Sequence, residues 1–190
     1  YISKTAIYCN DRSISEGEYN TVTIPFYYGS ATRLKTNKTP TYKCGGDVNG
    51  GLFEGTQAIA DKFSASTDDG GNGQLKYPIA LMTADEVSFA GGVEEINLSS
   101  PYAWYYTNSH GNSVTGSNHW FSLSPYSKAS RFVLVTYIYG SGSPGRLDCD
   151  STVGDEFYIR PVISISECAK VKSGIGTPES PYEIAESSCN

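Results

Sequence analysis

The sequence is poor in charge, in basic clusters and in long apolar runs. Charged residues make up 18% of the chain, and 14 scattered Lys and Arg face 20 Asp and Glu, for a net charge of −6. Without a basic stripe that could displace counterions from phosphates, we expect no nucleic-acid partner and no membrane-surface patch. No apolar run approaches the roughly 20 residues that a membrane-spanning helix needs. Because the chain begins at Tyr1 and not at Met, we expect a processed or truncated form whose leader or anchor is missing.

Motifs for metal binding and nucleophilic catalysis are equally scarce. The five cysteines lie far apart without a CxxC pair, and the two histidines are His110 and His119. Zinc sites draw on ligands at short spacing, and neither histidine has a nearby Ser or Cys frame, so we expect no metal and no catalytic residue. We expect the cysteines to form disulfides in an exported protein, although the sequence leaves the connectivity of these disulfides open. The pairs we predict, with Cys149 left over, are Cys9–Cys44 and Cys168–Cys189.

Tyrosine and glycine are abundant, with 15 and 20 copies among 190 residues. This aromatic, loop-rich composition is typical of a folded β-rich domain and not of a disordered chain. The length fits a single domain over 1–190, in which 1–50 forms a strand-and-loop part. We therefore expect an α+β fold with a twisted antiparallel sheet, one or two short helices and long loops.

Local patterns in the first half predict individual elements. Residues 19–28 and 31–34 indicate short strands, and residues 55–64 indicate a short helix capped by Thr56. An apolar run of strand length covers 77–82.

The clearest local signal is a capping box that begins a helix at Thr83. Thr83 can accept from the amide of Glu86, while the Glu86 side chain can reach back to the Thr83 amide. Gly91-Gly92 ends this helix after a few residues. Its acidic side chains are expected to serve the cap and to face solvent.

In the second half, alternation predicts two strands. Residues 131–139 divide into two faces. The face expected in the core carries Phe132, Leu134 and Ile138, and the other carries Val133, Val135, Tyr137 and Tyr139. In 159–165, Ile163 and Ile165 alternate with Ser164, which predicts a half-buried strand. A glycine turn at 173–177 and a short extended segment at 181–184 follow.

Five short motifs occur in a fixed order along the chain. They are Cys9-Asn10-Asp11-Arg12-Ser13; Tyr77-Pro78-Ile79 running into Thr83-Ala84-Asp85-Glu86-Val87 and Ala90-Gly91-Gly92; Trp120 with Leu123-Ser124-Pro125; Arg160-Pro161-Val162-Ile163; and Gly174-Ile175-Gly176-Thr177 with Pro181-Tyr182-Glu183-Ile184. In this order they resemble a family of surface proteins from gut Firmicutes, many of which carry a prepilin-like N-terminal helix. The C-terminal part of that family is similar to the C-type lectin fold in its formylglycine-generating-enzyme-like form. Variable proteins of diversity-generating retroelements use this scaffold.

The resemblance implies a C-type lectin-like, surface-displayed ligand-binding domain that is not an enzyme. Its framework would be Trp120, Leu123, Ser124, Pro125, Arg160, Pro161 and Val162. Between them lies the variable binding region within 119–166, whose diversified positions would come from 126–131 and 136–155. Adenine mutagenesis converts Asn and Tyr codons to Ser, Gly, Asp, Arg or Cys codons, which fits the composition of this region and a stray Cys149. The expected location is extracellular, at the bacterial surface, with a pilus or surface assembly reached through the missing N-terminal segment.

The Tyr-, Ser-, Gly-, Asp- and Arg-rich stretch between the framework strands is the candidate binding face. Tyrosine offers large contact area at low entropic cost, so Tyr126, Tyr137 and Tyr139 are the expected exposed anchors. Charged side chains beside them would set specificity for an unknown protein or glycan. The predicted ligand contacts are Tyr126, Ser127, Lys128, Arg131, Tyr137, Tyr139, Ser141, Ser143, Arg146, Asp148 and Asp150.

Alternatives stay open at this point. One alternative is a calcium ion bound by Asp148 and Asp150, with Asp155-Glu156 further along the chain. The sequence motifs of calcium-dependent sugar-binding lectins are absent, however. The rival functions are a structural minor pilin, whose face packs against a neighbouring subunit, and a formylglycine-generating-like enzyme. The enzyme needs a second reactive cysteine beside Cys149, which is otherwise expected to be a solvent-facing thiol or a partner of another cysteine, Cys9 or Cys44.

Two framework residues have a structural and a ligand-binding interpretation. Trp120 is expected in the core with its N–H satisfied locally, whereas Trp104 is evenly balanced between the core and stacking on a sugar. For Arg160 we favour an ion pair with a buried acid, or bonds to loop carbonyls, over contact with a ligand.

Overall fold

The computed structural model describes residues 2–3, 7–10, 14–16, 25–41, 59–62, 79–96, 118–129, 132–140, 143, 145–177 and 179–185. Within these ranges short helices accompany mostly antiparallel strands, which confirms the α+β class. The strands are β1 (Ile7–Asn10), β2 (Ile14–Glu16), β3 (Phe26–Tyr28), β4 (Ile59–Lys62), β5 (Ala80–Leu81), β6 (Trp120–Ala129), β7 (Phe132–Ile138), β8 (Leu147–Thr152), β9 (Tyr158–Ile159), β10 (Pro161–Val162), β11 (Val171–Ser173) and β12 (Glu183–Ile184). The helical segments are α1 (Gly29–Ala31), the π-helical turn η1 (Thr32–Thr36) and α2 (Ala84–Phe89). None of the helices in these ranges has the length and apolarity to cross a membrane.

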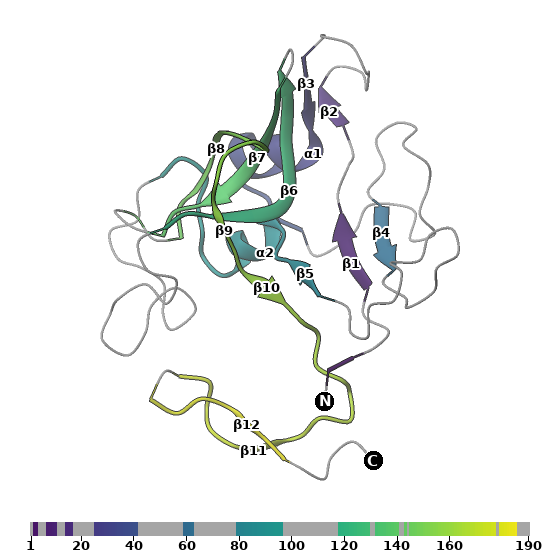
Figure 1. Cartoon of the computed structure of the whole chain (residues 1–190), viewed down its shortest axis with the longest axis vertical. Helices are drawn as coiled ribbons and strands as arrows, with labels where there is room; N and C mark the ends of the chain where they lie inside the picture. The colour runs from purple at the N-terminus through teal and green to yellow at the C-terminus, as the bar shows by residue number, and fades with distance from the viewer. Residues whose placement is uncertain are drawn as a thin grey trace.

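The main sheet has the strand order β2-β3-β6-β7-β8, and β9 pairs in parallel with the start of β6 (Figure 1). The long strand β6 pairs with β7 from Trp120 to Ala129, and its register shifts on both sides of Pro125. Proline cannot donate to a ladder, so such a residue is tolerated in a strand only at an edge or an irregularity. The Pro125 carbonyl instead accepts a hydrogen bond from the Ser30 hydroxyl at 2.7 Å, which ties α1 to the sheet.

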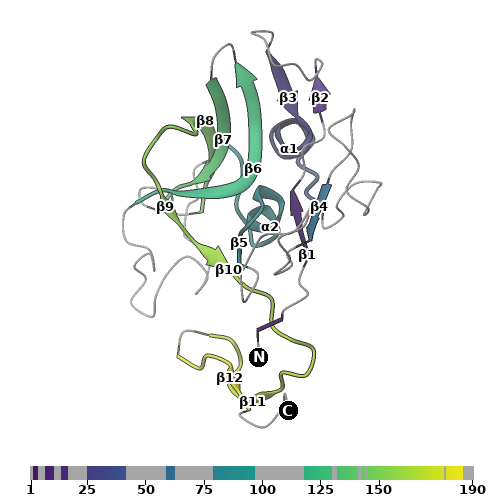
Figure 2. The same cartoon turned by 45° about the vertical axis from the view of Figure 1, so that its right-hand side comes forward.

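The largest apolar cluster lies between β6, β7 and β8 and the helices α2 and η1. The strands contribute Trp120, Ile138 and Leu147, each fully buried. The helices contribute Leu34, Ala84 and Val87. Both α1 and α2 lie against β6 in the two views of the chain (Figures 1 and 2). This core fixes the position of β7 and β8, which carry the predicted contact residues Tyr137, Asp148 and Asp150.

Helix α2 begins at the predicted capping box. The Glu86 amide donates to Thr83 Oγ1 at 3.1 Å, and the Thr83 amide donates to Glu86 Oε2 at 2.8 Å. The prediction that its acids face solvent is wrong for Asp85, which is 4% exposed. Arg33 donates to both Asp85 oxygens, at 2.7 and 2.6 Å, in a fork-like pair that links η1 to α2.

Two predicted elements in the first half are wrong in type. Residues 31–34 are helical and not extended, because a helical turn places Ala31 and Leu34 on one buried side. Within 55–64, residues 59–62 form β4, which pairs with β1 in antiparallel register. Pairing with a strand some fifty residues away overrides the weak local helix signal.

Two predictions of burial also fail. Phe132 is 59% exposed because it starts β7 at the end of the β6–β7 hairpin, beyond the helices that cover the sheet, whereas Leu134 and Ile138 do pack in core clusters. Ile163 and Ile165 are 46% and 59% exposed, because in the described ranges β10 pairs only with the short β5, in a small sheet separate from the main one.

The last described segment lies apart from the main sheet. Strands β11 and β12 pair with each other, as the predicted glycine turn and extended segment require, and they lie below the rest of the chain in both views (Figures 1 and 2). Ile2 bridges to Ile165 at the start of this segment, so the beginning of the chain lies beside it.

Candidate functional site

The outer face of β7 and β8, defined as the side opposite Trp120, Ile138 and Leu147, brings together five predicted contact residues. Tyr137 pairs with Asp148 across the two strands. Asp150 lies on the same face, because its carboxylate accepts a hydrogen bond from the Tyr137 hydroxyl across a shift in the β7–β8 register. Arg146 completes the group, since its Nη2 donates to Asp148 Oδ2 at 2.5 Å and its guanidinium lies 4.8 Å from the ring centre of Tyr139.

An aromatic cluster covers this face, and three of its members were missed by sequence reasoning. The ring of His119 lies 4.2 Å from that of Tyr139, and Tyr137 stacks on Tyr139 at 5.7 Å. Phe157 lies 4.8 Å from Tyr137 and 5.0 Å from Phe121. His119, Phe121 and Phe157 lie at strand ends and in a connection, where no alternation marks them. Only the folded structure shows that these three side chains lie beside other aromatic rings.

Tyr137 is the floor of this cluster and not an exposed anchor, which corrects the prediction. It is 4% exposed, and its hydroxyl donates to Asp150 Oδ1 at 2.6 Å. Burial, and then the bond to the Asp150 carboxylate, raise the pKa of Tyr137, so it remains a neutral donor. Partly exposed Tyr139 and His119 and exposed Asp150 therefore form the accessible part of the outer face.

His119 presents one defined tautomer. The Gly140 amide donates to its Nδ1 at 3.2 Å, so that nitrogen accepts and the neutral ring carries its proton on Nε2. Burial lowers the pKa of His119 and outweighs the opposing effect of Asp148 and Asp150. The ring is therefore a neutral aromatic surface with one donor at ordinary pH.

The other predicted contacts that the structure describes do not join this face. Tyr126, predicted to be exposed, is 6% exposed on the inner side of β6, where it meets Tyr27 edge to face at 5.9 Å. Ser127 and Ser143 are 3% and 4% exposed. Lys128 is half-buried near the end of β6, where it pairs with Phe26. Arg131 and Ser141 lie outside the described residues.

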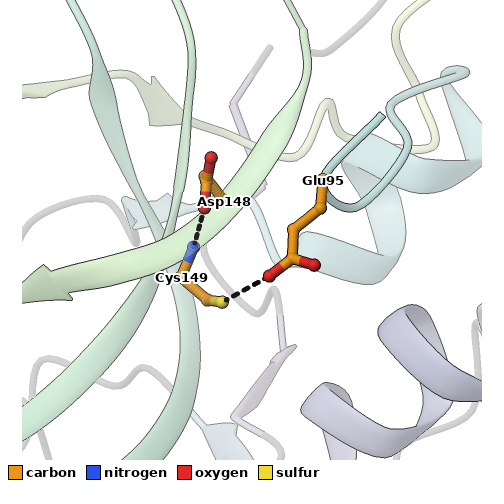
Figure 3. A group of neighbouring side chains, drawn as sticks. All are labelled: Glu95, Asp148 and Cys149. Atoms are coloured by element: carbon orange, nitrogen blue, oxygen red, sulfur yellow. Dashed lines mark hydrogen bonds between the residues drawn. The ribbon is translucent and has the colours of Figure 1, made fainter. Parts of the chain in front are cut away.

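Cys149 lies on the inner side of β8, close to Glu95 and next to Asp148, whose side chain leaves the strand on the other side (Figure 3). The expectation of a solvent-facing thiol is wrong, because Cys149 is 6% exposed and packs with Ala31, Tyr126 and Leu134. Burial raises the pKa of this free thiol to about 12. Its Sγ lies 3.6 Å from Glu95 Oε1, and its amide donates to Asp148 Oδ1 at 2.9 Å.

The framework residues are largely structural in their contacts. Trp120 is fully buried as expected, but its Nε1 has no hydrogen-bond partner among the residues that the structure describes, contrary to the expected local bond. The guanidinium of Arg160 lies 4.7 Å from the Trp120 ring centre, a cation–π contact. Ser124 is 3% exposed and accepts from the Ala84 amide at 2.9 Å, so it holds the start of α2 against β6.

The predicted disulfides are not decided by the described residues. Cys168 is disulfide-bonded, but Cys44 and Cys189 lie outside the described ranges, and so do Trp104 and His110. Both pairings stay predictions. Comparison with protein-family models, with curated proteins and with solved structures finds no match to the chain in any of the three.

Proposed function

We propose that the chain is a ligand-binding protein displayed at the bacterial surface and not an enzyme, and that the outer face of β7 and β8 contacts its ligand. The ligand is a protein or a glycan. The single observation that carries this proposal is the half-exposed aromatic cluster around Tyr139, which is bordered by the charged side chains of Arg146 and Asp150.

The chemistry of this cluster suits recognition. Stacked rings that are already held in place lose little side-chain entropy on binding, and aromatic and Arg residues dominate the energetics of interfaces. Arg146 is held by Asp148 and Tyr139, so its guanidinium has a fixed position. Fixed rings with a fixed cation fit a flat polar partner such as a sugar ring or a backbone segment.

The arrangement of framework and face supports a C-type lectin-like variable protein. Ser124, Trp120 and Arg160 make internal contacts beneath the sheet. Tyr139 and Asp150 lie on the opposite side, within the stretch whose diversification we propose. A division of this kind lets outer side chains change while the packing contacts stay the same. Comparison of sibling genes tests it: changes should gather at outer-face positions in 136–155, and uniform change along the gene would refute diversification.

Binding is tested on an array of glycans and cell-surface proteins. We expect the wild type to bind at least one array member and Tyr139→Ala to lose that signal. The matched control is Tyr182→Ala, which removes another tyrosine, 58% exposed, beyond β11. A hit that Tyr139→Ala and Asp150→Ala both retain would place the site elsewhere. Burial of the outer face in a purified pilus would favour the structural-subunit alternative instead.

A further inference from the structure

The segment 93–95 lies along β8 and brings two acidic residues to Cys149. Leu147 donates its amide to the Val93 carbonyl at 3.1 Å, and the Glu95 amide donates back to the Leu147 carbonyl at 2.9 Å. Glu94 forms a parallel bridge with Leu147. This pairing fixes both glutamates beside the strand that carries Cys149.

Three side chains bring possible ligand atoms close together, although Asp148 and Cys149 leave β8 on opposite sides. The Sγ of Cys149 and carboxylate oxygens of Glu95 and Asp148 all lie within 4.8 Å of one another (Figure 3). Glu95 is at the exposed rim, where Lys35 Nζ donates to its Oε1 at 2.5 Å, with both side chains about two-fifths exposed. Cys149 and Asp148 are buried behind this rim, each 6% exposed.

Glu94 provides an independent observation, because its carboxylate is buried without a cation in direct contact among the described residues. The residue is 2% exposed, and among the described residues neither carboxylate oxygen has a hydrogen bond of standard geometry, although the Cys149 thiol interacts with it. A buried carboxylate without partners is costly unless a cation or a proton neutralises it. The groups that perturb its pKa include Cys149, Asp148 and Glu95, so this carboxylate lies beside the same cluster.

The negative charge of the cluster can be balanced by one additional cation. With the thiol ionised, Glu94, Glu95, Asp148 and Cys149 carry four negative charges. Within the described part of the chain, the cations in direct ion-pair contact with them are Lys35 and Arg146. The two negative charges that remain match one divalent ion.

We propose that Glu94, Glu95, Asp148 and Cys149 form a binding site for a borderline divalent transition-metal ion of the Zn²⁺ class. A thiolate together with carboxylates suits this class better than it suits Ca²⁺ or Mg²⁺, which prefer oxygen ligands throughout. As the metal–sulfur bond forms, the Cys149 proton leaves to solvent, so binding releases a proton. Metal–ligand bonds of about 2.0–2.3 Å then draw the donor atoms closer together.

The test uses tag-free chain stripped with chelator and titrated with Zn²⁺ alone by calorimetry. We expect one Zn²⁺ bound at a site that Glu94→Gln and Cys149→Ser each weaken at least tenfold. Glu183→Gln is the matched control, because it removes an exposed carboxylate on β12, and it should bind as the wild type does. Co²⁺ in place of Zn²⁺ should show a thiolate-to-metal charge-transfer band that Cys149→Ser abolishes.

Three results would overturn the proposal. The first is no Zn²⁺ bound by the wild type, and the second is Zn²⁺ binding that both Glu94→Gln and Cys149→Ser leave unchanged. The third is Ca²⁺ binding tighter than Zn²⁺ at the same residues, which would mean an all-oxygen site without the thiolate. Circular dichroism of each variant establishes that it is folded before its affinity is compared. None of these outcomes depends on the ligand of the outer face, so this test stands apart from the proposed function.

Discussion

At the scale of single residues, Glu94 and Asp85 show two ways of burying a carboxylate. Asp85 is neutralised by Arg33 and also accepts from the Thr41 amide at 2.9 Å. Glu94 has no such partners, and burial raises its pKa to about 7. The same chain thus contains one buried acid that is paired with a cation and one that has no such partner among the described residues.

The unfavourable burial of the ionised Glu94 carboxylate should make the free energy of unfolding depend on pH. Its folded pKa of about 7 lies above the ordinary value of 4.5, so the folded state binds the proton more tightly than the unfolded state does. Stability should therefore fall as pH rises from about 4.5 to about 7, and stay lower above that range. In chelator at pH 8, Glu94→Gln should raise the free energy of unfolding by about 1–3 kcal/mol. Urea denaturation at pH 5 and pH 8 checks this.

The glutamine variant should also lose most of the pH dependence, because it has nothing to titrate there. If wild type and Glu94→Gln kept the same stability difference at both pH values, the carboxylate would not be held at a cost in the folded state. Glu183→Gln again serves as the control, and it should follow the wild type at both pH values.

At the scale of elements, the fork-like pair of Arg33 and Asp85 is the main polar link between η1 and α2 among the described contacts. Replacing Arg33 by Met keeps the aliphatic stem but leaves the Asp85 carboxylate buried without its cation. Removing one partner of a buried pair costs about 3 kcal/mol or more, so Arg33→Met should unfold at markedly lower urea concentration. Lys35→Met, which breaks the exposed pair with Glu95, should cost less than about 1 kcal/mol. Equal losses in the two variants would contradict this account.

Elements set by neighbouring residues could be predicted from the sequence, whereas elements set by distant contacts could not. The capping box needs only Thr83 and Glu86, three positions apart, and it was predicted correctly. Strand β4 depends on pairing with β1, and the helical turn at 31–34 depends on packing beneath β6, so local patterns gave the wrong type. The burial of Asp85 likewise depends on an arginine 52 positions away.

At the scale of the whole molecule, the sheet separates two groups that the sequence presented as one stretch. The predicted contacts in 126–150 divide between the outer face, with Tyr139 and Asp150, and the inner side, with Tyr126. Alternation along β6 places Tyr126 on the same side as Trp120, which the strand pattern alone could have indicated. The contributions of His119 and Phe157 could not have been foreseen, because they reach the outer face from outside β7 and β8.

The outer face is the central claim, and the affinity of the array ligand for matched tyrosine variants tests it most directly. We predict that Tyr139→Ala weakens binding at least tenfold, equivalent to about 1.4 kcal/mol, as expected for an aromatic residue near the centre of an interface. Tyr182→Ala, on the distant β11–β12 segment, should bind within twofold of the wild type. Equal affinity of the wild type and Tyr139→Ala, with both proteins folded, would contradict the account.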